Sequence, residues 1–139
     1  MEFAVILGLV AVATVFGLVW KRGQGRVVPV SGQTISLNYR VAGKTTLLQF
    51  TTELCAPCAL LKPRLEQIAL YRSDVEHVVV DAVEHLDLAN NLSVRTTPTT
   101  FIIGPDGDIR ARIHGVAPAE VFVNAIDGKA VEPTEEISI

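Results

Sequence analysis

The chain contains two cysteines, Cys55 and Cys58, which are separated only by Ala56 and Pro57. They come at the point where the residue pattern of a strand gives way to the pattern of a helix. The thiolate is the reactive form of cysteine, and a free thiol with a pKa of about 8.5 provides few thiolates at neutral pH. At a helix N-terminus, unpaired backbone amides and the positive end of the helix dipole would stabilise the Cys55 anion.

This spacing predicts thiol–disulfide exchange. Cys58 would follow Cys55 by one helical turn, close enough to attack a mixed disulfide formed on Cys55 and to release the partner. We therefore expect Cys55 to be the nucleophile and Cys58 the resolving thiol, the two closing into a redox disulfide. Pro57 falls in the first helical turn, where its missing N–H costs no hydrogen bond. With no further cysteines, the chain cannot be a disulfide-stapled scaffold.

The remaining sequence alternates between two periodicities. Apolar–polar alternation or short β-prone apolar runs predict strands, and apolar residues at helical spacing predict helices. Strands are expected at residues 35–39, 46–50, 75–83, 99–103 and 109–114, and helices at residues 59–71, 84–92 and 118–127. Helices between the earlier strands indicate parallel pairing, and the glycine-containing turn before the last strand indicates an antiparallel hairpin. The order predicts an α/β domain with a mixed central sheet.

From residue 34 to residue 128 this order resembles the thioredoxin fold. The matching features are a strand that leads to the Cys-Ala-Pro-Cys motif, a helix that contains Pro63, a buried strand, a short helix and the run at residues 94–99 around Pro98. The resemblance implies a thioredoxin-like three-layer α/β/α architecture and thiol–disulfide oxidoreductase activity. It implies no bound cofactor and no metal.

The same resemblance assigns residues around the dithiol. Pro98 would follow a cis peptide bond and face the cysteines. The backbone at Thr97 would be an edge on which an extended substrate peptide adds as a strand. Gly115 would keep this surface open, and Pro57 would help to tune the redox couple. The implied partners are proteins with thiols or disulfides and a second redox protein that supplies or accepts electrons.

Three positions depart from the family pattern. Leu54 stands where a tryptophan commonly precedes the first cysteine. Gln49 stands where a buried aspartate commonly manages the proton of the second thiol, and glutamine cannot titrate. His77 aligns approximately with a lysine that is often paired with that aspartate. We therefore expect slower exchange or a different base, for which Glu53 or water is the hypothesis.

The N-terminal segment predicts a membrane anchor. Residues 3–20 carry no charged side chain and, as a helix, would extend about 27 Å, close to the roughly 30 Å of a bilayer core. Trp20 suits the membrane interface, and Lys21 and Arg22 follow at once. A cleaved secretory signal is the alternative, but such signals begin with a positive region, whereas Glu2 precedes this run. The positive-inside rule places the globular part in the cytoplasm, and an extracytoplasmic domain is the alternative.

These features predict a single-pass membrane protein. Its parts would be an anchor at residues 1–20, a linker at residues 21–33, a thioredoxin-like domain at residues 34–128 and a mobile tail at residues 129–139. The net charge is −3 and the basic residues are scattered, so no surface typical of nucleic-acid binding is expected.

Alternative readings of the cysteine motif fit less well. A zinc site would need two more ligands, and His77, His85 and His114 are too scattered to form such a pair. Thr52 lies where peroxiredoxins place a threonine before their reactive cysteine, but Leu48 stands in place of the proline of that family. A third alternative is a non-catalytic module that binds peptides.

Cys-Ala-Pro-Cys is closer to the reducing motif Cys-Gly-Pro-Cys than to motifs with histidine before the second cysteine. This likeness favours disulfide reduction over oxidation.

Overall fold

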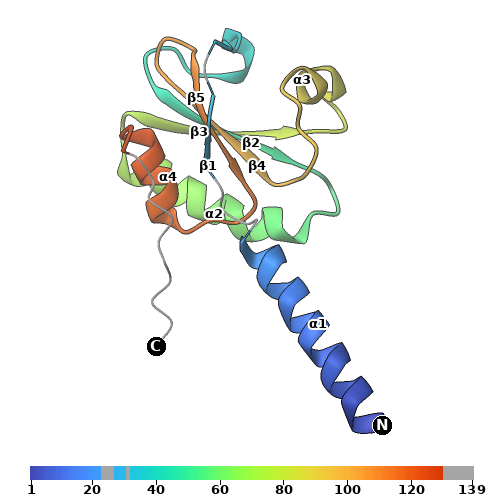
Figure 1. Ribbon diagram of the computed structural model, residues 1–139. Helices are drawn as coiled ribbons and strands as arrows, with labels where there is room; N and C mark the ends of the chain where they lie inside the picture. Colours follow the sequence, from blue (N-terminus) through green and yellow to red (C-terminus); the bar gives the residue numbers. More distant parts are fainter. Residues whose placement is uncertain (23–26, 31, 130–139) are drawn as a thin grey trace.

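The central sheet has five strands in the order β1-β5-β4-β2-β3 (Figure 1). The structure is a computed structural model that describes residues 1–22, 27–30 and 32–129. The strands are β1 (Val27–Pro29), β2 (Thr45–Thr51), β3 (Val75–Asp81), β4 (Thr99–Ile103) and β5 (Ile109–His114). β2 pairs with β3 in parallel, and the remaining neighbours are antiparallel, which confirms the mixed sheet.

The strand β2 lies inside the sheet, between β4 and β3, and leads directly to the dithiol. Residues 45–50 of this strand are all buried, as expected for a continuous β-prone run covered on both faces. Helix α2 (Ala56–Tyr71) then carries the chain back to β3, because parallel neighbours require a crossover connection. Both cysteines therefore lie beyond the C-terminal end of β2, at the start of α2.

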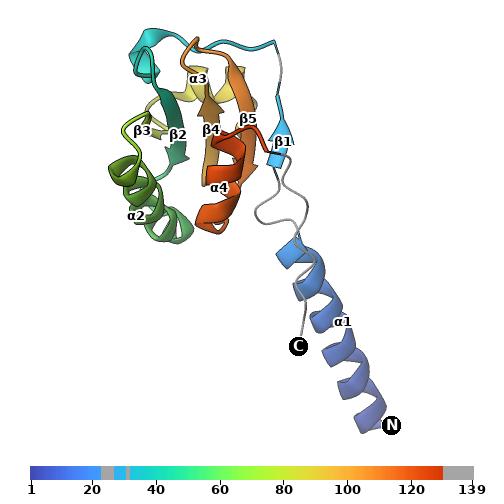
Figure 2. The ribbon, with the colours of Figure 1, turned by 90° about the vertical axis from the view of Figure 1, so that its left-hand side faces the viewer.

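Helices cover both faces of the sheet (Figure 2). Helices α2 and α4 (Ala119–Ile126) pack on one face, where Leu47, Leu65 and Phe122 are fully buried. The short helix α3 (Leu86–Asn91) packs on the opposite face, where the rings of Phe50 and Phe101 meet edge to face with centroids 5.7 Å apart. These layers confirm the expected α/β/α architecture.

The strand expected at residues 35–39 is wrong. The structure has a 3₁₀ helix there, η1 (Leu37–Tyr39), preceded by an isolated bridge between Thr34 and Asp108. Ile35 is buried, whereas Leu37 is 62% exposed, so the alternating apolar residues do not line one face of a sheet. An alternation this short contributes one buried side chain, and that is too little to hold the segment in a strand.

The fifth strand comes from an earlier segment than expected. β1 lies within residues 21–33, which the sequence analysis assigned to a linker, and it pairs with β5 in antiparallel register. Residues 23–26, 31 and 130–139, which belong to the expected linker and tail, lie outside the described residues. The sheet of the domain therefore begins before residue 34.

The connection between β3 and α3 is longer than the sequence predicted. β3 ends at Asp81 instead of residue 83, and α3 begins at Leu86 instead of residue 84. The Asp81 carboxylate accepts hydrogen bonds from the backbone amides of Val83, at 2.8 Å, and Glu84, at 3.2 Å. Such bonds from a side chain to nearby amides stabilise a turn in place of a strand or helix.

Arg112 on β5 links the end of α3 to the sheet. Its guanidinium carbon lies 4.8 Å from the ring centre of Phe101, in a cation–π contact. The same guanidinium donates to the backbone carbonyls of Leu92 and Ser93, just after α3. These carbonyls belong to the end of a helix, where acceptors lack partners within the helix.

The N-terminal helix α1 (Glu2–Arg22) is long and apolar enough to cross a membrane. All of its residues are exposed, so the sheet domain covers none of its apolar surface. The helix begins beside the acidic Glu2 and ends at the basic Lys21 and Arg22, charges that match its dipole. In Figure 1 it extends away from the sheet.

Candidate active site

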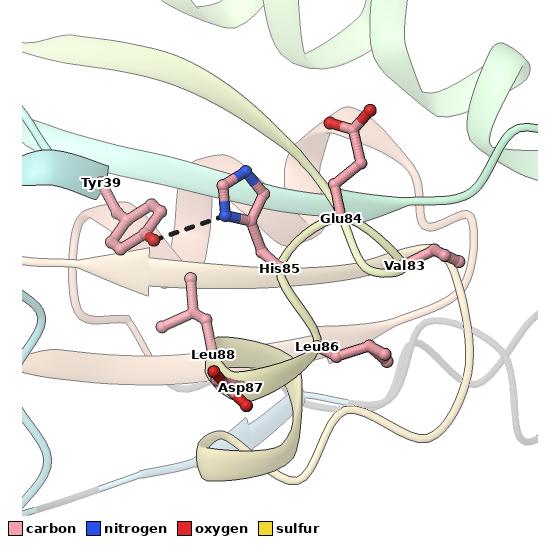
Figure 3. A pocket seen from close by; sticks show the side chains of 7 residues that line it. All are labelled: Tyr39, Val83, Glu84, His85, Leu86, Asp87 and Leu88. Atoms are coloured by element: carbon pink, nitrogen blue, oxygen red, sulfur yellow. Dashed lines mark hydrogen bonds between the residues drawn. The ribbon is translucent and has the colours of Figure 1, made fainter.

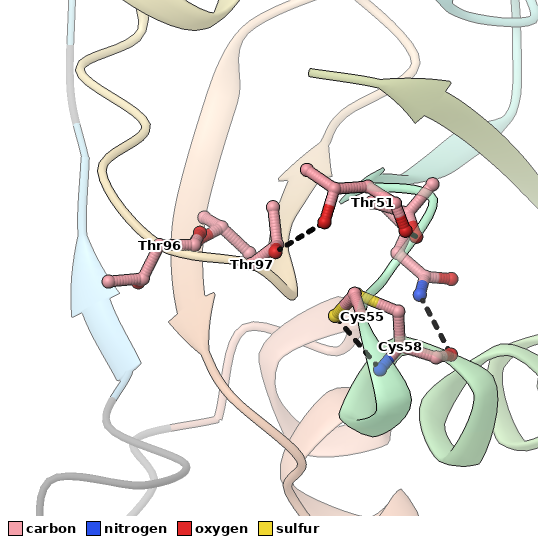
Figure 4. The surroundings of a disulfide bond; sticks show 8 residues. Thr51, Cys55, Cys58, Thr96 and Thr97 are labelled. Atoms are coloured by element: carbon pink, nitrogen blue, oxygen red, sulfur yellow. Dashed lines mark hydrogen bonds between the residues drawn. A yellow bond between two sulfur atoms is a disulfide. The ribbon is translucent and has the colours of Figure 1, made fainter. Parts of the chain in front are cut away.

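The two cysteines form a disulfide at the start of α2 (Figure 4). Cys55 is the N-cap residue of the helix, and its Sγ accepts a hydrogen bond of 3.2 Å from the backbone N–H of Cys58. Pro57 lies in the first turn, as expected. Cys55 is half-buried, whereas Cys58 is buried with 4% of its surface exposed. The outer sulfur is therefore the one that a partner can reach, and an amide is already directed at it.

A second loop completes the surface beside the dithiol. The peptide bond between Thr97 and Pro98 is cis, as the resemblance implied. The hydroxyl oxygens of Thr97 and Thr52 lie 3.4 Å apart, which joins this loop to the segment that precedes Cys55. The backbone N–H of Gly115 donates to the carbonyl of Pro98 at 2.9 Å. The structure thus brings Thr97, Pro98 and Gly115 together with the dithiol loop.

Gly115 meets this loop with a backbone that favours glycine. Its φ is +74°, in the left-handed region that other residues rarely adopt. Thr97 is half-buried and Pro98 is buried, so Thr97 is the more accessible of the two residues at this surface. Figure 4 shows Thr96 and Thr97 in the loop before β4, with Thr97 on the side of the cysteine loop.

Behind the dithiol lies a polar contact within the core. Gln49 on β2 is 1% exposed, and its Nε2 donates to the backbone carbonyl of Cys58 at 3.4 Å. Its Oε1 lies 2.9 Å from Nε2 of His77 on β3. Burial lowers the pKa of His77 below the ordinary value of 6.5; the charge of Glu66 raises this pKa, and that of Lys62 lowers it.

The family pattern placed Gln49 and His77 at two positions that are often paired, but their direct contact and its extension to the Cys58 carbonyl were not predicted. The available signal was an amide in an otherwise apolar buried run, two residues from Leu47, together with an imidazole on the next strand. By contrast, Glu53 is exposed on the loop before the cysteines. Leu54, next to Cys55, is 97% exposed and places an apolar side chain at the rim of the site.

A separate cavity of about 280 Å³ lies beside the connection between β3 and α3 (Figure 3). It is lined by Tyr39 and residues 83–88. The hydroxyl of Tyr39 lies 3.4 Å from Nδ1 of His85, and the two rings meet edge to face. His77 and His85 therefore contact different partners. Residues 1–22, 27–30 and 32–129 contain no cluster of His, Cys, Asp and Glu that could hold a metal ion.

Comparison with known proteins agrees with this geometry. The family model described as Thioredoxin matches residues 29–128. The chain belongs to the thioredoxin family. The chloroplastic thioredoxin-like protein CITRX of Oryza sativa subsp. indica is 29% identical over 119 residues, which cover 73% of this chain and 63% of the rice protein. The chloroplastic thioredoxin Y2 of Arabidopsis thaliana is 33% identical over 85 residues, which cover 60% of this chain and 50% of that protein.

The thioredoxin fold is also found in the solved structures that resemble this chain. The oxidised form of mitochondrial thioredoxin 3 from Saccharomyces cerevisiae superposes with a TM-score of 0.55 at 27% identity, over 61% of this chain and 79% of the yeast chain. The chain spans between half and two thirds of the length of the two plant relatives. Both the fold and the family expected from the sequence are confirmed.

Proposed function

We propose that this thioredoxin-family protein catalyses thiol–disulfide exchange on protein substrates. The observation that carries this proposal is the asymmetry of the dithiol, in which Cys55 is half-buried at a helix N-terminus and Cys58 is buried behind it. Helix-end amides favour a thiolate at the outer position. A buried partner within bonding distance is the arrangement that a resolving thiol needs.

The reaction in the reducing direction has two steps. The Cys55 thiolate attacks one sulfur of a substrate disulfide, and the other substrate sulfur leaves as a thiolate that takes a proton from water. Cys58 then loses its proton and attacks Sγ of Cys55, which breaks the mixed disulfide, closes the Cys55–Cys58 bond and releases the second substrate thiol. A redox partner protein with a dithiol returns the pair to the reduced state.

The surface around Thr97 fits an extended peptide. In our proposal, the backbone at Thr97 pairs with the substrate as an added strand, next to Pro98, and Gly115 leaves room for its approach. The exposed Leu54 adds an apolar contact at the rim. Pro57, exposed in the first turn of α2, helps to set the redox couple.

We further propose that α1 tethers the domain to a membrane, with the domain in the cytoplasm, and that the protein reduces its substrates. The apolar length of α1 and its basic end support the tether and its orientation. The likeness of Cys-Ala-Pro-Cys to reducing motifs supports the direction. Labelling of intact cells with a membrane-impermeant thiol reagent tests the orientation, because a cytoplasmic dithiol stays unlabelled until the cells are lysed.

Insulin reduction by the full chain in detergent micelles, with dithiothreitol as electron source, tests the exchange activity. We expect turnover above that of dithiothreitol alone, and its loss in Cys55→Ser. Cys58→Ser keeps the nucleophile but not the resolving thiol, so it is expected to accumulate a mixed disulfide on Cys55. Absence of turnover in the folded wild-type chain would favour a peptide-binding module whose dithiol is idle.

A further inference from the structure

We propose that His77 is a positioning residue for the dithiol, which it reaches through Gln49, and that its protonation is coupled to the oxidation state of Cys55 and Cys58. The proposal rests on the exchange activity proposed above. The structural basis is one unbroken series of hydrogen bonds, from Nε2 of His77 to Oε1 of Gln49 and from Nε2 of Gln49 to the carbonyl of Cys58. Gln49 is a fully buried side chain on β2, inside the sheet, so no water is available to replace either partner.

The bonding pattern fixes which nitrogen of His77 carries a proton. The Cys58 carbonyl can only accept, so the NH₂ group of Gln49 must face it. The oxygen of Gln49 then faces His77 and requires a donor, which makes Nε2 of His77 protonated in the neutral ring as well as in the cation. Nδ1 is the nitrogen at which a proton is gained or lost. The chain to Cys58 therefore persists in both protonation states.

The surroundings of His77 leave its charge sensitive to the dithiol. The charges that act on the imidazole are Glu66 and Lys62 of α2, which have opposite effects and are themselves 3.8 Å apart as an ion pair. On β2 the neighbours are the apolar Leu47, which pairs with His77 in the sheet register, and the neutral Gln49. Burial disfavours the imidazolium, so a negative charge on the dithiol, to which Gln49 links the ring, would change its population.

Reduction of the dithiol supplies such a charge. Two electrons from a partner dithiol break the Cys55–Cys58 bond, and the two partner sulfurs close into a disulfide and release two protons. One proton goes to Cys58, while Cys55 is held as a thiolate by the helix end; the second proton goes to Nδ1 of His77 or to water. A thiolate raises the affinity of His77 for this proton, and by linkage a protonated His77 makes the dithiol easier to reduce.

Nuclear magnetic resonance with histidine-selective labelling, on the full chain in micelles, tests the coupling directly. We expect the proton affinity of His77 to be about threefold or more higher in the reduced state than in the oxidised state. His85, which contacts Tyr39 beside the separate cavity, is the internal control, and its signals should not depend on the oxidation state of the dithiol. Equal titration of His77 in the two states would overturn the proposal.

Variants separate coupling through Gln49 from a general effect of charge. The measured quantity is the equilibrium constant between the dithiol and glutathione, followed from pH 5 to pH 8. His77→Gln should reduce the change in this constant over that range by about threefold, whereas His85→Gln should leave the change as it is in the wild type. Gln49→Met has a similar shape but no N–H donor and only a weakly accepting sulfur, and should reduce the redox-dependent change at His77. A wild-type change in folded Gln49→Met would refute the role of Gln49. The insulin assay with Cys55→Ser tests exchange without involving His77. A failure of the coupling can therefore be distinguished from a failure of exchange.

Discussion

The two faces of the central sheet are built differently. Under α3 the core is centred on Phe50 and Phe101, and the polar side chains buried beside them on β2 and β4 are the threonines Thr46 and Thr99. Under α2 and α4 the core is mostly apolar, but Gln49, its register partner Thr100 and the half-buried His77 place polar groups in it, and Gln49 joins His77 to Cys58. Burial of a polar group is unfavourable unless it is hydrogen-bonded, so packing alone would select an aliphatic residue at position 49. The face under α2 and α4 therefore differs in that its buried amide contacts the helix that carries the dithiol.

The largest expected effect concerns the apolar face. Phe101→Ala should lower the free energy of unfolding by about 3–5 kcal/mol, because it removes a fully buried ring and leaves a cavity. Phe101→Leu, which keeps most of the volume, is the matched control and should cost less. Urea unfolding followed by circular dichroism measures both. The exchange rate per folded molecule should not change, and a comparable loss of rate would mean that the two faces are not separate in function.

On the polar face, Gln49→Met should have a smaller effect on stability and a clear effect on redox equilibrium. The Cys58 carbonyl and the His77 N–H would lose their shared partner, which costs about 1–3 kcal/mol for buried groups. The same urea experiment gives the stability, and equilibration with glutathione gives the redox effect. An unchanged redox equilibrium would show that this face, like the other, serves packing alone.

The pH dependence of stability sharpens the comparison further. Burial lowers the pKa of folded His77, so the unfolded chain binds the proton more readily. The contribution of His77 to the free energy of unfolding is therefore fully present above the ordinary pKa of 6.5. It is lost as the pH falls from 6.5 through the lower pKa of the folded state, so stability should rise with pH in this window. For one proton the slope is at most about 1.4 kcal/mol per pH unit.

Urea unfolding of the oxidised chain between pH 4.5 and 7.5 measures this slope. His77→Gln should have a shallower dependence than the wild type. Parallel curves for His77→Gln and the wild type would mean that the imidazole does not titrate differently in the folded and unfolded states.

The smallest expected change in stability lies outside both faces, at Leu54. This side chain is 97% exposed, so Leu54→Ser should change the free energy of unfolding by no more than about 0.5 kcal/mol. Its position next to Cys55 predicts a higher KM for a protein substrate with little change in reduction of a small disulfide. Steady-state kinetics with insulin and with a small aromatic disulfide distinguish the two. Equal effects on both substrates would indicate that Leu54 acts on the dithiol instead of on docking.

Most of the fold was predictable because its signals are local. The hairpin of β4 and β5 follows from two apolar runs joined by a turn, in which Gly107 has a φ of +94°. The position of Cys55 at the start of α2 follows from the helical pattern after it. Where the local signal is weak, the prediction was wrong, as at residues 35–39, which form a 3₁₀ helix while β1 occupies the sheet edge.

The sequence by itself determined the dithiol, the order of elements from β2 onward and the family, because a cysteine spacing and an apolar period are properties of neighbouring residues. Only the tertiary structure decided that Gln49 lies between His77 and Cys58, and that Arg112 covers Phe101 and the end of α3. These contacts join residues far apart in the chain, and they depend on the register of the strands and the placement of helices on each face. No local pattern contains that information, because register is settled only when the whole core packs.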